Sequence, residues 1–208
     1  MGTTVLLTGF GPFPGAPFNP TGPLVKRLAR LRRPALAQVT IVPHIFRTSY
    51  AAVDGDLPRI IAMHRPDALL MFGLATRARS LRIETRARNT LSIIPDAAGL
   101  SPHRRVIAAG ASAAIAMPAQ MRRLLAAVHT TSVPVTLSHD AGRYLCNYLC
   151  WRAAEAAGRI GGPRLAAFVH VPTIARGARQ SAKRRKLTLG DLTRAGTAIL
   201  VALATDQQ

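Results

Sequence analysis

The 208-residue chain alternates short apolar runs with longer segments whose apolar residues recur at helical spacing. Short apolar runs bounded by glycine and proline predict buried strands, and the segments between them predict amphipathic helices. This alternation shows no internal repeat and no linker. It predicts one α/β domain over residues 1–208, a three-layer α/β/α sandwich with a mostly parallel, twisted sheet. The expected strands are Thr4–Thr8, Val39–Val42, Ala68–Phe72, Leu81–Glu84, Val133–Leu137 and Arg164–Pro172.

The helices expected between these strands complete the layers on both faces of the sheet. The segment from residue 92 to residue 106 contains two prolines and is expected to be irregular. The expected helices are 21–31, 50–63, 117–129, a run that ends near Gly158, and a last helix that ends near Ala204.

The chain is strongly basic, with 28 lysines and arginines against 9 acidic residues and a formal net charge of +19. Such a charge can attract nucleic acid or an anionic membrane surface. The basic residues are, however, spread along the chain and are not interleaved with aromatic residues, which favours solvated faces. The densest run, Ala182–Lys186, is expected in a loop. We therefore expect weak nonspecific polyanion binding and no specific nucleic-acid partner, and keep a polyanion-binding module as a third hypothesis.

The N-terminus lacks the basic segment of a secretion signal, and no apolar run reaches the ~20 residues that span a membrane. Two cysteines without a signal predict a reducing, cytoplasmic location and no disulfide framework. Cys146 and Cys150 are four residues apart on one expected helix, which is a poor zinc pattern without a second pair. We expect no metal, no cofactor and no membrane association.

The stretch from Ser138 to Trp151 joins an expected strand to an expected helix. Ala141 and Gly142 turn the chain, and Cys146 follows within about one helical turn. A thiol near the N-terminus of a helix feels the positive end of the helix dipole, which favours the thiolate. Cys146 is therefore a candidate nucleophile. Its use as a small apolar packing residue remains open from the sequence.

A cysteine nucleophile needs a base and a group that orients this base. His170 lies near the end of an expected strand, at the edge of the sheet where α/β folds collect their sites. Glu84 is the only acidic residue between Asp67 and Asp96 and is set among arginines. From the residues alone, a core histidine and a surface carboxylate paired with neighbouring arginines remain open alternatives.

Four segments, in order, resemble the pyrrolidone-carboxylate peptidase family of cysteine peptidases, also called pyroglutamyl peptidase I. The resemblance spans nearly the whole chain, and its last two segments are the most specific. The segments are Thr8–Phe13 with Asn19–Pro20, Glu84–Asn89 with Ile94–Asp96, Ser138–Asn147, and Phe168–Pro172.

The resemblance implies a cysteine exopeptidase that hydrolyses the amide bond after an N-terminal pyroglutamyl residue through an acyl-enzyme. It implies Cys146 as nucleophile, His170 as base and Glu84 as orienting acid. The implied partners are N-terminally pyroglutamylated peptides and, since family members often self-associate, further copies of the chain. A divergent amidase that acts on another cyclic or blocked acyl group is the second hypothesis.

The resemblance also implies a substrate pocket. Phe10 and Phe13 would flank the flat lactam, Asn19 would hold the loop or the polar edge of the ring, and Tyr144 would form another wall. A pyroglutamyl residue has no free amino group, so its pocket should be largely apolar with few hydrogen bonds to the lactam.

The chain departs from the family pattern at four places. The family's Gly-x-Ala-Gly-Gly-Arg-like turn is replaced by residues 73–79, Gly-Leu-Ala-Thr-Arg-Ala-Arg. The arginine that precedes the Ile-Pro-Asp segment and borders the active site in the family is absent before Ile94–Asp96. Arg143 replaces a small polar residue, and Cys150 is unusual. We expect these departures to alter the rate, the substrate preference or the charge of the cleft.

Overall fold

The computed structural model describes residues 2–13, 15–175 and 186–205. Of the basic run at residues 182–186, only Lys186 lies among them. The strands are β1 (Thr3–Phe10), β2 (Val39–Phe46), β3 (Ala68–Leu74), β4 (Leu81–Glu84), β5 (Arg86–Arg88), β6 (Ala114–Ala116), β7 (Val135–Ser138) and β8 (Leu165–Val171). The helices are α1 (Thr21–Ala29), α2 (Tyr50–His64), α3 (Met121–His129), α4 (Leu145–Ala157) and α5 (Leu189–Thr205), with a 3-10 turn at Pro34–Leu36.

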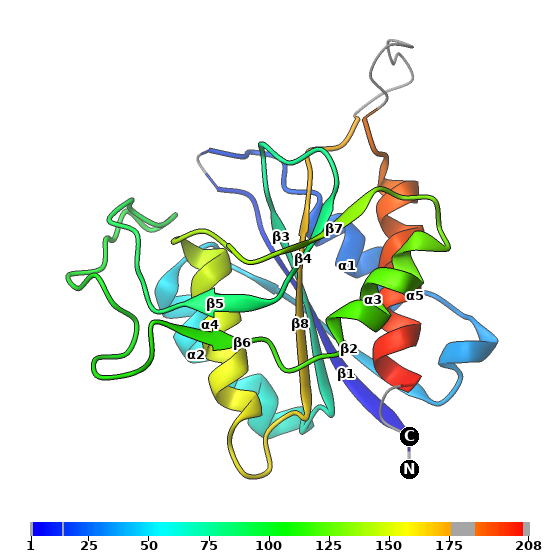
Figure 1. The fold of residues 1–208 in the computed structure, drawn as a ribbon, viewed down its shortest axis with the longest axis horizontal. Coiled ribbons are helices and arrows are strands. Elements are labelled where there is room, and N and C mark those ends of the chain that lie inside the picture. Colours follow the sequence, from blue (N-terminus) through cyan, green and yellow to red (C-terminus); the bar gives the residue numbers. More distant parts are fainter. Residues whose placement is uncertain (1, 14, 176–185, 206–208) are drawn as a thin grey trace.

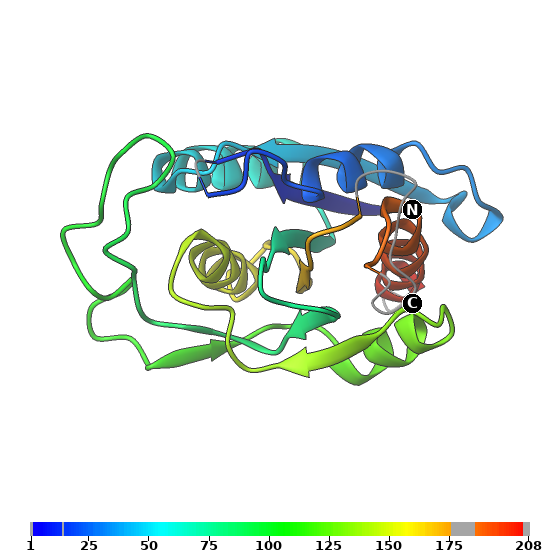
Figure 2. The same ribbon diagram turned by 90° about the horizontal axis from the view of Figure 1, so that it is seen from above.

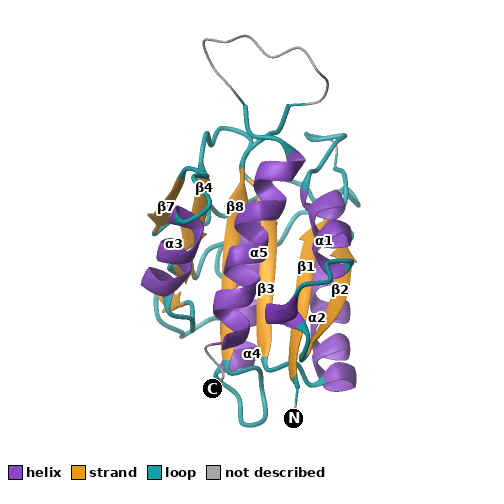
Figure 3. Cartoon of the chain, turned by 90° about the vertical axis from the view of Figure 1, so that its right-hand side faces the viewer, coloured by secondary structure: helices purple, strands orange, loops and turns teal. Residues whose placement is uncertain are grey.

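Six strands form the central sheet in the order β2-β1-β3-β8-β4-β7 (Figure 1). Every neighbouring pair is parallel except β4 and β8, which run antiparallel. The helices α1, α3 and α5 cover one face of the sheet, and α2 and α4 cover the other (Figure 3). The expected α/β/α arrangement with a mostly parallel sheet is confirmed.

Two apolar layers hold the helices to the sheet because alternate residues of a strand point to opposite faces. On β3, Leu70 and Phe72 pack with α1 and α5, whereas Leu69 and Met71 pack with α2 and α4. Both layers therefore draw on the same strand, which explains its unbroken apolar run. Seen from above, α4 and α5 lie on opposite sides of β8 (Figure 2).

Several element boundaries differ from the sequence expectation. The strand β2 continues through Pro43 to Phe46, which an edge strand tolerates because one side of its backbone has no ladder partner. The strand β3 continues through Gly73, which pairs with His170. The helix α3 begins at Met121 rather than Met117, because the preceding segment forms β6 and pairs with β5 in a separate two-stranded sheet.

None of the described helices is long and apolar enough to cross a lipid bilayer.

Replacing Leu70 with alanine tests how much the packing of β3 contributes to the free energy of unfolding. The Leu70 side chain is completely buried, so Leu70→Ala should lower the free energy of unfolding by about 2–5 kcal/mol. Met63→Ala is the matched control, because Met63 is 64% exposed and its loss should change stability by less than about 0.5 kcal/mol. Urea unfolding followed by circular dichroism measures both; equal midpoints for the two variants would contradict the packing described.

Candidate active site

Glu84 and His170 meet on the only antiparallel strand pair of the central sheet within the described residues. Arg82 on β4 is the register partner of His170 on β8, which brings Glu84, two residues on, to the same face. Glu84 Oε1 lies 2.7 Å from His170 Nδ1, and the two residues are 0% and 6% exposed. An ionised carboxylate can only accept, so Nδ1 carries the proton and Nε2 is left for another partner. Glu84 is thus buried against a histidine, not paired with arginines on the surface.

Cys146 is the second residue of α4 and is half-buried. No side chain caps this helix. The first backbone hydrogen bond at its N-terminus runs from the Tyr148 N–H to the Tyr144 carbonyl. Among the described residues, the N–H groups of residues 145–147 have no acceptor. The thiol therefore stands at the uncapped positive end of the helix dipole.

The pKa of His170 depends on its burial and on its two neighbours, Cys146 and Glu84. Burial by itself lowers the pKa of His170. The negative charge of Cys146, the hydrogen bond with Cys146 and the hydrogen bond with Glu84 outweigh it and raise the pKa to about 9. The structure thus brings Cys146, His170 and Glu84 together, and the raised pKa favours the imidazolium form of His170 at neutral pH.

Gly73 lies directly beneath the thiol. Gly73 lies on β3 and is the register partner of His170 on β8. A Cβ atom at this position would fall 2.8 Å from Cys146 Sγ and 2.5 Å from Phe168 Cζ, closer than real Cβ contacts. The sulfur therefore packs on bare backbone, and glycine is needed for this close approach. The sequence indicated only that Gly73 ends a strand and begins the turn at residues 73–79.

Asn147, the residue after the nucleophile candidate, is completely buried. Its Oδ1 accepts from Arg88 N–H at 2.8 Å, and its Nδ2 donates to the carbonyls of Arg88 at 2.8 Å and Thr90 at 3.1 Å. These bonds tie α4 to β5, which follows Glu84 after a single residue. The sequence indicated no role for Asn147, although it stands inside one of the two most specific segments.

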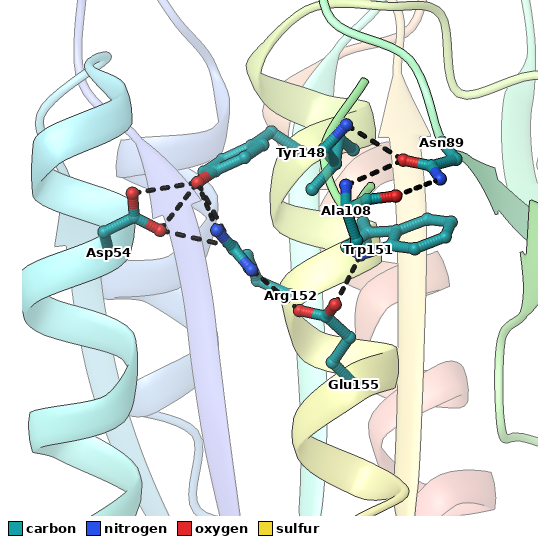
Figure 4. A network of polar contacts seen from close by, with 8 residues as sticks. Asp54, Asn89, Ala108, Tyr148, Trp151, Arg152 and Glu155 are labelled. Carbon is teal, nitrogen blue, oxygen red and sulfur yellow. Dashed lines mark hydrogen bonds and ion pairs between the residues drawn. The ribbon is translucent and has the colours of Figure 1, made fainter. Parts of the chain in front are cut away.

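A second set of polar contacts ties α4 to α2 (Figure 4). The Tyr148 hydroxyl lies 2.7 and 2.8 Å from the two carboxylate oxygens of Asp54 and accepts from Arg152. Arg152 also bonds Glu155 at 2.9 Å, and Trp151 Nε1 donates to the same carboxylate at 2.7 Å. The helix that carries Cys146 is thereby held on two sides.

The two phenylalanines predicted to flank a lactam differ in exposure. Phe10, the last residue of β1, is buried and packs on Phe46 with ring centroids 5.9 Å apart. Phe13 is half-buried in the following loop, where its backbone pairs with that of Ala16. Cys146 packs against the apolar cluster that contains Phe10.

Asn19 is buried and bonded within the same loop. Its Nδ2 donates to the Gly11 carbonyl at 3.1 Å, and its Oδ1 accepts from Thr21 N–H at 3.1 Å. Its amide therefore connects the loop after β1 to the start of α1.

Tyr144 immediately precedes α4, and its hydroxyl donates to the Pro95 carbonyl at 2.9 Å. Burial, Asp96 and Cys146 all raise the pKa of Tyr144. Tyr144 and Cys146 pack against the same apolar cluster. The side chain of Arg143 is exposed. Cys150 is a free thiol one turn after Cys146, and complete burial raises its pKa well above the usual value.

Within residues 2–13, 15–175 and 186–205, no group of three or more histidine, cysteine, aspartate or glutamate side chains could hold a metal ion.

Residues 3–204 match the family model described as pyroglutamyl peptidase. The pyrrolidone-carboxylate peptidase of Halalkalibacterium halodurans is 34% identical over 209 residues, covering 98% of this chain and 100% of that relative. That of Thermococcus kodakarensis is 31% identical over 169 residues, covering 81% of this chain and 80% of that relative.

Two solved structures agree with the fold. Pyroglutamyl peptidase I of Bacillus amyloliquefaciens superposes with a TM-score of 0.84 at 28% identity, covering 98% of this chain and 97% of that chain. Pyrrolidone carboxyl peptidase of Thermococcus litoralis superposes with a TM-score of 0.87 at 23% identity, covering 99% and 94%, and supports the fold alone. Because the family model spans nearly the whole sequence and the relatives match along most of their length, the chain belongs to the pyroglutamyl peptidase family.

Proposed function

We propose that the chain hydrolyses the amide bond after an N-terminal pyroglutamyl residue, with Cys146 as nucleophile, His170 as base and Glu84 as the orienting acid. The observation that carries this proposal is the buried 2.7 Å contact between Glu84 and His170, with Cys146 on the other side of the histidine. Membership of the pyroglutamyl peptidase family supports the substrate class.

The mechanism follows from the charge states. The Cys146 thiolate attacks the pyroglutamyl carbonyl carbon, and the His170 imidazolium protonates the leaving amine as the C–N bond breaks. This leaves a thioester on Cys146. Neutral His170 then removes a proton from water, which attacks the thioester and releases pyroglutamate. Glu84 holds the ring so that Nε2 faces the sulfur throughout.

The negative oxygen that develops during attack needs donors. The N–H groups of residues 145–147 lack acceptors at the start of α4, so they supply preorganised donors beside the reacting carbon. This main-chain arrangement does not require the arginine that the chain lacks before Ile94.

The lactam would lie against the apolar cluster beside Cys146. Phe10 belongs to this cluster, and Tyr144 packs against it. We assign these two residues and Phe13 as walls of the lactam pocket, with Asn19 as the residue that fixes the loop carrying Phe13. Such a pocket suits a flat ring with no charge.

Cys146→Ser should reduce release of aminomethylcoumarin from its pyroglutamyl amide by more than about 10³-fold, because the hydroxyl is a far weaker nucleophile than the thiolate. Cys150→Ala is the matched control: it removes the neighbouring buried thiol and should retain turnover. Undiminished activity in Cys146→Ser would refute the assigned nucleophile, and no activity in the unaltered protein would refute the substrate class.

The pH–rate profile should lose activity as pH rises through about 9, the raised pKa of His170, because deprotonation removes the proton for the leaving amine. Glu84→Gln keeps an acceptor for Nδ1 but removes the charge that helps raise this pKa. Its alkaline limb should therefore move to lower pH, and turnover should fall about 10²- to 10⁴-fold. An unmoved alkaline limb would contradict the role given to Glu84.

Gly73→Ala should slow turnover and alkylation of Cys146 by iodoacetamide, because the added methyl group occupies the space of the sulfur and the Phe168 ring. Overpacking should also lower the free energy of unfolding by about 1–3 kcal/mol. Gly55→Ala is the control, since nothing lies within 4 Å of a Cβ at Gly55 in α2. Equal alkylation rates in the two variants would show that the thiol does not depend on Gly73.

A further inference from the structure

A cavity of about 460 Å³ opens at the carboxyl ends of β3 and β8. Thr76 and Arg77 line it after β3, and Pro172 lines it after β8. These are the strands that carry Gly73 and His170. The cavity therefore lies a few residues beyond Gly73 and His170 along the chain, at the edge of the sheet where α/β folds bind ligands.

The cavity is cationic. Arg77, Arg79 and Lys186 line it, all three are exposed, and none of the described residues that line it is acidic. None of the three makes an ion pair within the described part of the chain. The acidic residue nearest to Lys186 in the sequence, Asp191 in the first turn of α5, is bonded to Thr188 and Arg194. The one nearest to Arg79, Glu84, is bonded to His170. The cavity thus offers unpaired donors to an anion.

Two of these basic residues, Arg77 and Arg79, lie in the turn at residues 73–79, where the sequence departs from the family pattern. By the resemblance described above, Thr76 and Arg77 stand where the family turn carries two glycines. Both residues line the cavity. In this chain Gly73 lies against Cys146, and the residues that depart from the pattern line the cavity beyond it.

The distances suit the leaving group of the reaction. Pro172 lies two residues beyond His170, just after β8 ends at Val171, or about 7 Å away at the rise of a strand. An extended peptide advances about 3.3–3.6 Å per residue. The one or two residues that follow the scissile amide are thus long enough to span this distance.

We infer that this cavity is a carboxylate-binding subsite on the leaving-group side of the active site, with Arg77 and Arg79 as its principal donors. It rests on the proposed function, and adds a substrate preference to it. The preferred substrates are pyroglutamyl peptides with a carboxylate in the first two leaving residues, supplied by a free C-terminus or by an acidic side chain. Guanidinium groups suit this ligand because they bind carboxylates through paired hydrogen bonds.

Competition between matched peptides in one reaction tests the inference. Pyroglutamyl-alanine is paired with pyroglutamyl-alanine amide, and pyroglutamyl-glutamate amide with pyroglutamyl-glutamine amide. The ratio of initial rates, read by mass spectrometry, gives the ratio of kcat/KM. The carboxylate member of at least one pair should be favoured about 5- to 10-fold, and the pair that shows the preference identifies the source of the carboxylate.

The double variant Arg77→Gln/Arg79→Gln should bring the preferred ratio close to 1 and leave kcat/KM for the neutral coumarin amide unchanged. The control Arg27→Gln/Arg122→Gln removes the same charge from exposed positions on α1 and α3 and should keep the ratio. Ratios near 1 in the unaltered protein, or a preference that survives in Arg77→Gln/Arg79→Gln, would overturn the subsite. If the protein hydrolyses neither the four peptides nor the coumarin amide, the proposed function and the subsite are overturned together.

Discussion

The buried contact between Glu84 and His170 is the interaction on which the rest of the site depends. Burying a carboxylate is costly unless a positive charge or hydrogen bonds compensate it. Glu84 has one oxygen on His170, while Oε2 has no partner within the described residues. The imidazolium therefore supplies most of the compensation, and Cys146 as well as Glu84 raises its pKa. His170 thus links Glu84 and Cys146, and the charge of its ring depends on both neighbours.

The topology of the sheet makes this contact available. A purely parallel sheet would place the ends of β4 and β8 at the same edge, but the antiparallel pairing places Glu84 beside Phe168 and lets it reach back to His170. On the other side, bare backbone at Gly73 lets α4 approach the sheet closely enough for the sulfur to face the ring. The amide of Asn147 and the Tyr148–Asp54 contact then fix the helix in this position.

The sequence was sufficient for the layers, because strand and helix periodicities are local. The three candidate catalytic residues were assigned their roles only through the resemblance to the family's motifs, and these roles are proposed. The sequence was insufficient where a residue's role is set by a distant partner. The β5–β6 pairing, the bonds of Asn147 to Arg88 and the packing of Cys146 on Gly73 all join segments far apart in the chain. Pro43 likewise favoured the end of a strand, which its place on the sheet edge overrides.

For the charged residues, too, position in the fold decides the role of a side chain more than composition does. Nine acidic residues cannot neutralise 28 basic ones, and several of the nine have specific partners, such as Glu84 with His170 and Asp54 with Tyr148 and Arg152. Most of the surplus lies on solvated faces, where water and salt screen it. A surplus arginine acquires chemical meaning only where the fold gathers it with others around a concave space beside reacting groups, and in the described part of the chain Arg77 and Arg79 meet that condition.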